Sequence, residues 1–150
     1  MYSVQGNVVQ KLRSYRQYDS WREEYEDKIC SADDAAALIK SDDRIAMCGG
    51  TSVPYEFSRA LSKRAGQIKN VGISMGYAMG LFDYMKPEHH ESFYLETVFV
   101  GPMERICMEW GVCKFVPIHL GDTANYLNAS NINIAAARVT PPDEDGFMCR

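Results

Sequence analysis

The sequence lacks an apolar run long enough to cross a membrane, which takes about 20 consecutive apolar residues. It also lacks an excess of basic residues: 16 Lys and Arg stand against 20 Asp and Glu, and the net charge is −4. Nucleic-acid binding proteins usually carry a basic face, so this balance argues against nucleic acid as a partner. We therefore expect a soluble protein, with no membrane partner, that acts on a small molecule or on another protein.

Paired cysteines and metal-ligand spacings are missing as well. The five cysteines are an odd number, and no two of them show a CxxC spacing. A chain of 150 residues can bury a core that needs no disulfides. We expect free thiols in a reducing compartment and a cytoplasmic location. His89 and His90 are adjacent, which points them apart on any regular element, so no metal site is expected.

The first 18 residues differ in charge from the rest of the chain. They contain Lys11, Arg13 and Arg16 but no acidic residue. This composition fits either a mitochondrial targeting segment or a plain N-terminal extension over 1–18, and we favour the extension because the signal has little specificity. From residue 19 the pattern becomes regular, and apolar residues at helical spacing predict an amphipathic helix over 19–29.

The remainder alternates between short apolar runs and amphipathic segments, separated by turn residues. Strands are predicted at 44–48, 71–75, 93–100, 114–118 and 131–139. Helices are predicted at 32–39, 54–64, 102–110 and 122–127, the first capped by Ser31 and the second beginning at Pro54. This order predicts an α/β fold, with a mostly parallel sheet flanked by helices.

The corner after the first predicted strand, residues 49–54, is the segment most expected to face a ligand. Its sequence is Gly-Gly-Thr-Ser-Val-Pro. In open α/β sheets, ligands bind beyond the carboxyl ends of the strands, where glycine lets the backbone approach and helix N–H groups face the ligand. The corner is neither a P-loop nor a GxGxxG fingerprint. A sharp turn without a ligand is an equally good interpretation.

Other reactive residues favour structural interpretations. Cys48 could act as a nucleophile with His119 as its base, but a buried thiol is the better interpretation because free cysteine is among the most buried residue types. Glu104 and Arg105 favour a solvated or structural ion pair at a helix start. Residues 75–80, at another strand end, either line the same cleft as residues 49–54 or pack through small side chains.

Five stretches taken together resemble the N-terminal domain of the acetyl-CoA hydrolase/transferase family, closest to its 4-hydroxybutyrate and butyryl-CoA CoA-transferases. The stretches are residues 21–25 (WREEY), 44–54, 99–105 (FVGPMER), 116–120 (VPIHL) and 139–147. The resemblance covers 19–150 and implies a Rossmann-like CoA-transferase domain. It also implies that this chain is truncated before the family's C-terminal catalytic domain.

This resemblance implies transfer of CoA between carboxylic acids, such as acetate and butyrate or 4-hydroxybutyrate. A glutamate attacks the acyl-CoA thioester, and the resulting acyl-glutamyl anhydride is converted by the CoA thiolate into an enzyme–CoA thioester, from which a second acid takes the CoA. Coenzyme A is then a substrate, and no tightly bound cofactor is expected. The implied partners are acyl-CoA, a short-chain carboxylic acid, the protein's own C-terminal domain and further copies in a homo-oligomer.

The family's catalytic glutamate lies in the C-terminal domain, and none of Glu96, Glu104 and Glu109 matches it. No catalytic residue is therefore expected here: the chain would be inactive alone and would form one wall of the cleft. The expected substrate-binding residues are Gly49, Gly50, Thr51, Ser52, Pro54, Gly76, Pro117 and His119. Three alternatives stay open: an acyl-CoA hydrolase of the same family, a non-catalytic α/β ligand-binding module, and a sugar-phosphate isomerase that shares the fold.

Overall fold

A computed structural model of the protein describes residues 26–149. The expected extension over 1–18 and most of the helix predicted at 19–29 lie outside the described residues. The chain divides into two compact units. In the smaller unit, residues 26–30 include the 3₁₀ helix η1 (Glu26–Lys28), and residues 141–148 form a turn in which the N–H of Asp143 donates to the carbonyl of Phe147 at 3.0 Å.

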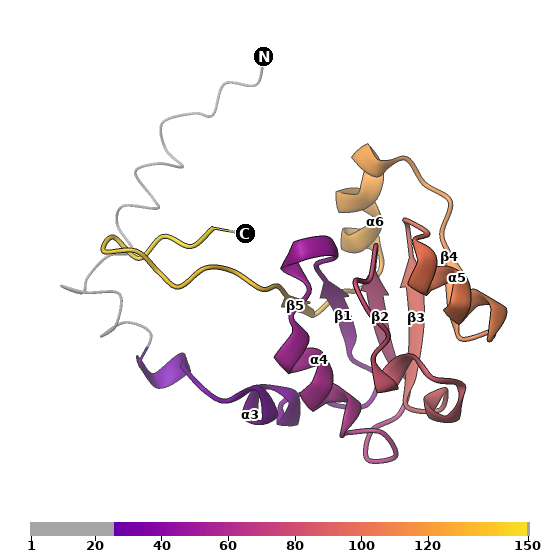
Figure 1. Cartoon of the computed structure of the whole chain (residues 1–150), viewed down its shortest axis with the longest axis horizontal. Coiled ribbons are helices and arrows are strands. Elements are labelled where there is room, and N and C mark those ends of the chain that lie inside the picture. The colour runs from indigo at the N-terminus through magenta and orange to yellow at the C-terminus, as the bar shows by residue number, and fades with distance from the viewer. Residues whose placement is uncertain (1–25, 150) are drawn as a thin grey trace. The chain divides into compact units, whose positions relative to one another are not determined.

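The larger unit, residues 31–140 with residue 149, is built on a five-stranded parallel sheet in the order β4-β3-β2-β1-β5 (Figure 1). Its strands are Arg44–Met47 (β1), Val71–Met75 (β2), Phe93–Thr97 (β3), Cys113–Phe115 (β4) and Ile134–Ala136 (β5). The prediction of an α/β fold with a mostly parallel sheet is confirmed. The central strand β2 is buried along its whole length, as expected of a parallel sheet with helices over its faces.

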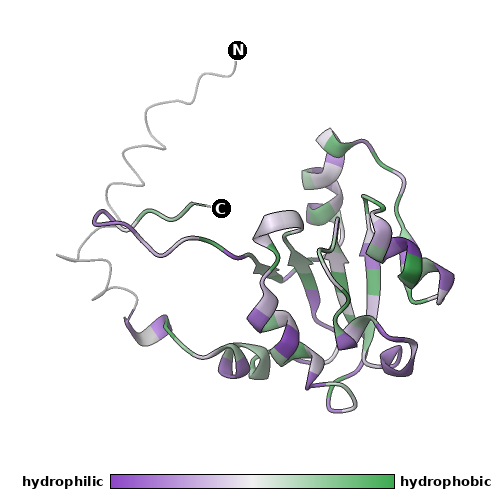
Figure 2. Ribbon diagram, in the orientation of Figure 1, coloured by the Kyte–Doolittle hydropathy of each residue, from purple (hydrophilic) through white to green (hydrophobic). Residues whose placement is uncertain are grey.

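Within residues 31–149, four α-helices and four 3₁₀ helices accompany the strands; α3 precedes β1 and the others lie between strands. They are α3 (Ala32–Ala37), η2 (Gly50–Ser52), α4 (Tyr55–Ser62), η3 (Asp83–Met85), η4 (Pro87–His89), α5 (Pro102–Glu109), η5 (Leu120–Asp122) and α6 (Thr123–Ala129). In Figure 2 hydrophilic and hydrophobic residues alternate along α4, the pattern of a helix that buries one side. The buried residues of α4 are Ser58, Ala60 and Leu61.

The order of the strands separates the helices onto two faces. From β1 to β4 the chain moves in one direction, and it then returns to place β5 on the other side of β1. Right-handed crossovers therefore put α4 and α5 on one face and α6 on the other. The face under α4 and α5 carries the main core, which includes Ile45, Ile73, Leu61 and Cys107.

Helix and strand ends follow local hydrogen bonding. The Ser31 side chain accepts the N–H of Asp34 at 3.1 Å and caps α3 as predicted. Strand β3 is shorter than predicted, because the Thr97 hydroxyl donates to the carbonyl of Phe99 at 2.7 Å and turns the chain out of the sheet. Pro54 is the N-cap of α4 and not its first helical residue. Between residues 26 and 149, no helix has the length and apolar character that crossing a bilayer requires.

Candidate functional site at the carboxyl edge of the sheet

Three loops meet where the parallel strands end, at the carboxyl edge of the sheet. They follow β1, β2 and β3 and span residues 48–54, 76–82 and 98–101. Ligands of open α/β sheets bind beyond this edge. The first two loops contain most of the residues predicted to contact a ligand: Gly49, Gly50, Thr51, Ser52, Pro54 and Gly76.

The first two loops touch at Gly49. A Cβ atom on Gly49 would lie 1.6 Å from the carbonyl oxygen of Gly76, a distance that no side chain can adopt. Gly50 has a φ of 59°, in the left-handed region that favours glycine, and its N–H donates to the carbonyl of Tyr77 at 2.9 Å. The close approach of the second loop therefore explains why residue 49 is a glycine. Contact between Gly49 and a ligand stays a prediction.

The rest of the first loop presents few polar side chains to solvent. Thr51 is exposed, whereas Ser52 is buried and its carbonyl accepts the N–H of Arg138 at 2.8 Å. Pro54 is buried at the start of α4. Of the two hydroxyl-bearing residues, Thr51 is thus the one placed to meet a ligand.

A groove of about 620 Å³ opens beside this loop, at the switch point between β1 and β5. It is lined by residues 54–57 at the start of α4, by Arg59 in its last turn, and by residues 137–139 after β5. Arg59 is paired at 3.2 Å with Glu56, which lines the same groove and offsets its charge. The remaining positive groups are Arg138 and the N-terminus of α4, which suit an anionic ligand.

A buried carboxylate ties the second loop to the third. The Glu104 residue is 3% exposed, and its carboxylate accepts the N–H of Ala78 and the N–H of Gly101, the latter at 3.0 Å. Two donors satisfy a charge that would otherwise be costly to bury. Arg105 is exposed, and no ion pair between it and Glu104 occurs in the described chain. The interpretation of Glu104 and Arg105 as an ion pair is therefore wrong.

Four exposed apolar side chains, here called the apolar rim, lie on the second and third loops of this junction. They are Tyr77, Met79, Leu81 and Phe99. The backbone of Tyr77 has a φ of 62°, which costs a residue other than glycine roughly 1–2 kcal/mol. Its ring meets that of Phe99 edge to face, with centroids 5.6 Å apart. The expected substrate-binding residues included none of these four, although Tyr77 and Met79 lie within residues 75–80, which we expected either to line the same cleft or to pack through small side chains.

The other predicted residues lie at the far end of the same edge. Pro117 and His119 follow β4, three strands from β1, which corresponds to a lateral separation of about 14 Å at the usual strand spacing. Both are exposed, and Pro117 lines a different cavity. Cys48 is half-buried, and no hydrogen bond joins it to His119 among residues 26–149. The structure therefore does not assemble a Cys–His pair.

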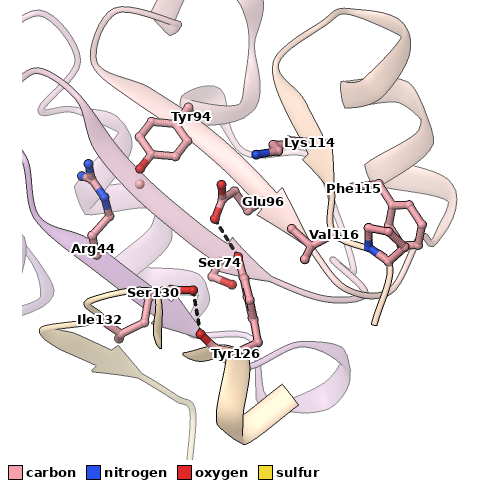
Figure 3. Close-up of a pocket in the computed structure, with 12 residues that line it drawn as sticks. Arg44, Ser74, Tyr94, Glu96, Lys114, Phe115, Val116, Tyr126, Ser130 and Ile132 are labelled. Atoms are coloured by element: carbon pink, nitrogen blue, oxygen red, sulfur yellow. Dashed lines mark hydrogen bonds between the residues drawn. The ribbon is translucent and has the colours of Figure 1, made fainter. Parts of the chain in front are cut away.

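That second cavity, of about 370 Å³, lies on the α6 face of the sheet (Figure 3). The Tyr126 hydroxyl of α6 donates to the Glu96 carboxylate of β3 at 2.6 Å. Burial raises the pKa of Tyr126, and this hydrogen bond raises it further. Arg44 and Lys114 also line the cavity, and Arg44 donates to three backbone carbonyls. Glu96 is therefore engaged on this face, away from the three loops.

Burial keeps two of the thiols in their protonated form. Burial raises the pKa of the Cys107 thiol to about 11 and that of Cys113 to about 12, so both are protonated at neutral pH. No cluster of three or more His, Cys, Asp or Glu side chains suited to a metal ion occurs among residues 26–149.

Comparison with known proteins identifies the relatives of this chain. It is 29% identical over 134 residues to a butyryl-CoA:acetate CoA-transferase of Anaerostipes caccae, and 23% identical over 129 residues to a 4-hydroxybutyrate coenzyme A transferase of Clostridium kluyveri. The matches cover 86% and 85% of this chain, respectively, but only 30% of each relative. The chain thus spans less than a third of the length of these curated relatives.

Solved structures share the fold of this chain, and a family model matches most of its sequence. The crystal structure of RipA from Yersinia pestis matches with a TM-score of 0.69 at 23% identity, over 81% of this chain and 31% of RipA. A structure of a RipA point mutant gives a TM-score of 0.73 over 85% of this chain. The model of the acetyl-CoA hydrolase/transferase N-terminal domain matches residues 11–149. This chain therefore belongs to the acetyl-CoA hydrolase/transferase family, of which it contains the N-terminal domain.

Proposed function

We propose that this chain forms one wall of the acyl-CoA cleft of a CoA-transferase that moves CoA between carboxylic acids such as acetate and butyrate. The observation that carries the proposal is that three loops meet at the carboxyl edge of the sheet, where ligands of open α/β sheets bind, in a chain of the acetyl-CoA hydrolase/transferase family. The exposed apolar side chains of the apolar rim lie on two of these loops and suit a short acyl chain.

The groove at the switch point offers a place for the anionic part of the substrate. Coenzyme A carries several phosphate charges, and Arg138 lines the groove together with the start of α4. Helix N-termini favour anions, and arginine pairs well with phosphate. We infer that a phosphate of CoA approaches this groove while the acyl end lies near the apolar rim.

None of the three glutamates considered from the sequence is placed to act as the nucleophile at the loop junction. Glu104 is buried with both oxygens engaged, and Glu96 accepts a hydrogen bond from Tyr126 on the α6 face. Glu109 is exposed at the end of α5, away from the carboxyl edge. We therefore propose that a C-terminal domain of the same polypeptide supplies the attacking carboxylate, and that the chain alone does not turn over.

In the proposed reaction, this carboxylate attacks the thioester carbonyl, forming an acyl-glutamyl anhydride and releasing the CoA thiolate. The thiolate then attacks the glutamyl carbonyl, so that the first acid leaves and an enzyme–CoA thioester remains. The second acid reverses these two steps and departs as the new acyl-CoA. The energy of the thioester is conserved through covalent catalysis, so no ATP is required.

Incubation of the full-length protein with butyryl-CoA and acetate tests the proposal. Chromatography should show that acetyl-CoA accumulates. With butyryl-CoA alone, mass spectrometry of the intact protein should show an increase equal to the mass of bound CoA. Formation of free CoA without acetyl-CoA would identify a hydrolase, and no consumption of butyryl-CoA or of other short acyl-CoA esters would favour a non-catalytic ligand-binding module.

A further inference from the structure

The cavity on the α6 face of the sheet has the size and the lining of a site for a small molecule. Its volume of about 370 Å³ is typical of small-molecule sites, and its walls come from four strands and from α6 (Figure 3). Strand pairing places Ser74, Glu96 and Lys114 side by side, because Glu96 is in register with Ser74 on β2 and with Lys114 on β4. No residue of the three loops lines this cavity, so it is separate from the proposed CoA cleft.

One end of the cavity is closed by two fixed side chains. A Cβ atom on Gly72 would lie 2.5 Å from the hydroxyl oxygen of Tyr94 and 2.8 Å from Cδ of Arg44, so both side chains lie across β2. The guanidinium carbon of Arg44 is 5.1 Å from the centroid of the Tyr94 ring. Its Nη1 donates to three backbone carbonyls. Arg44 therefore holds the ends of the strands together, and no ion pair joins it to Glu96 in the described chain.

Glu96 and Lys114 present opposite charges to the middle of the cavity. Tyr126 donates to one carboxylate oxygen of Glu96, whereas the other oxygen accepts no hydrogen bond from residues 26–149 and points away from Tyr126 in Figure 3. Lys114 is exposed and forms no ion pair within the same residues. An exposed Glu–Lys pair contributes little to stability, so a ligand that engages both charges meets weak competition from their pairing with each other.

We propose that this cavity binds a small carboxylic acid that also carries an ammonium or hydroxyl group, such as an α-amino or α-hydroxy acid. The ligand carboxylate pairs with Lys114, and its ammonium or hydroxyl group donates to the free oxygen of Glu96. A short apolar side chain then lies against Val116, Pro117 and Ile132, which also line the cavity. A simple anion such as phosphate is disfavoured, because it would approach the carboxylate of Glu96 without offering a positive charge.

Three acids with the same carbon skeleton test the site: leucine, its α-hydroxy analogue, and isocaproate, which lacks the α-substituent. Reductive methylation of the full-length protein with carbon-13 formaldehyde keeps the lysine charges and gives each lysine an NMR signal. The signal that is missing from Lys114→Arg belongs to Lys114. We expect leucine or its hydroxy analogue to shift this signal saturably, with a Kd at least about tenfold below that of isocaproate. The acid that binds more tightly identifies the donor group, and the signal of Lys86, which is paired with Asp83, should not move.

Glu96→Gln tests the contact with the donor group. Glutamine keeps an acceptor oxygen for Tyr126, but its amide nitrogen takes the place of the free carboxylate oxygen and cannot accept a hydrogen bond. The Kd of the tighter acid should rise by at least about tenfold, to the level of isocaproate. The matched control is Glu109→Gln, which removes the same charge from an exposed position at the end of α5 and should leave the Kd within about threefold.

The outcomes are distinct from those of the transferase assay, because no CoA is present. Equal affinities for the three acids, or no saturable shift of the Lys114 signal with any of them, would overturn the site. Failure of Lys114 to become methylated would show that another part of the full-length protein covers the cavity, and would overturn it as well. An unchanged Kd in Glu96→Gln would overturn the role of Glu96. If Glu96→Gln does not fold, the comparison of the three acids on the unsubstituted protein decides.

Discussion

Replacement of Gly49 by alanine should destabilise the chain through a contact between two loops. The backbone of Gly49 has φ −98° and ψ −175°, which alanine adopts without strain, so any effect comes from the added methyl group. That methyl would lie 1.6 Å from the carbonyl oxygen of Gly76, whereas Cβ atoms essentially never approach within 3.0 Å. The methyl group is attached directly to the backbone of one loop and the carbonyl belongs to the backbone of the other. The two loops must therefore move apart by at least the difference between these two distances.

The size of the effect follows from this displacement. Overpacking costs roughly 1–3 kcal/mol. A shift of this size also breaks the 2.9 Å hydrogen bond from Gly50 to Tyr77, which contributes about 1 kcal/mol more. We therefore expect Gly49→Ala to lower the free energy of unfolding by about 2–4 kcal/mol. With a urea m-value of roughly 2 kcal/mol/M, the unfolding midpoint should fall by roughly 1–2 M.

Urea unfolding of the 150-residue chain, followed by circular dichroism, measures this shift. Gly80→Ala is the matched control, because Gly80 lies in the second loop and a Cβ there has no atom within 4 Å. Its free energy of unfolding should stay within about 0.5 kcal/mol of the unsubstituted chain. Equal midpoints for Gly49→Ala and Gly80→Ala would refute the contact between the first two loops.

Three further predictions concern the two faces of the sheet. Tyr126→Phe removes the hydroxyl that donates to Glu96 and should lower the free energy of unfolding by about 1–2 kcal/mol. An unchanged urea midpoint would show that this hydrogen bond does not stabilise the packing of α6 on the sheet. Burial raises the pKa of Cys107 to about 11, so iodoacetamide at pH 8 should label the exposed Cys30 at least about tenfold faster than Cys107. Peptide mass spectrometry measures both rates, and similar rates would contradict the burial of Cys107. Burial also raises the pKa of Tyr84 above its usual range. Unfolded tyrosine ionises near pH 10, so the stability contributed by protonated Tyr84 is present below about pH 10 and lost above it. Tyr84→Phe should lose less stability than the unsubstituted chain between pH 9 and pH 11 in urea titrations, and an equal loss would count against the prediction.

The regular elements were predictable because local patterns determine them. Val71–Met75 is an apolar run between turn residues, and β2 has these same bounds. Helix α5 ends before Gly111 as predicted, because the N–H groups of Gly111 and Val112 return to the carbonyls of Met108 and Cys107 in a Schellman motif. These turn and capping residues lie within a few positions of the strand or helix that they terminate, so the sequence shows them directly.

The candidate site was only partly predictable, because its contacts join distant residues. The partner of Glu104 is the N–H of Ala78, 26 residues earlier, and no local pattern connects them. One signal was available: Glu104 is the third residue of α5, where a glutamate side chain can return to the N-cap N–H. Tyr77 lies in the segment 75–80 that was expected to line the cleft or to pack, but its left-handed backbone was not predictable, because such a conformation would be assigned to its neighbour Gly76 from sequence alone.

The position of β5 beside β1 has a consequence for how the chain folds. Ile45 pairs with Ile134, and the N–H of Arg44 donates to Asn133 across a separation of 89 residues. At roughly 5–20 residues per second, synthesis takes on the order of 5–20 s to supply that partner. During this interval β2, β3 and β4 can pair in order on one side of β1, while its other edge stays open to mispairing. We expect β5 to dock last, as the slow step that closes the sheet.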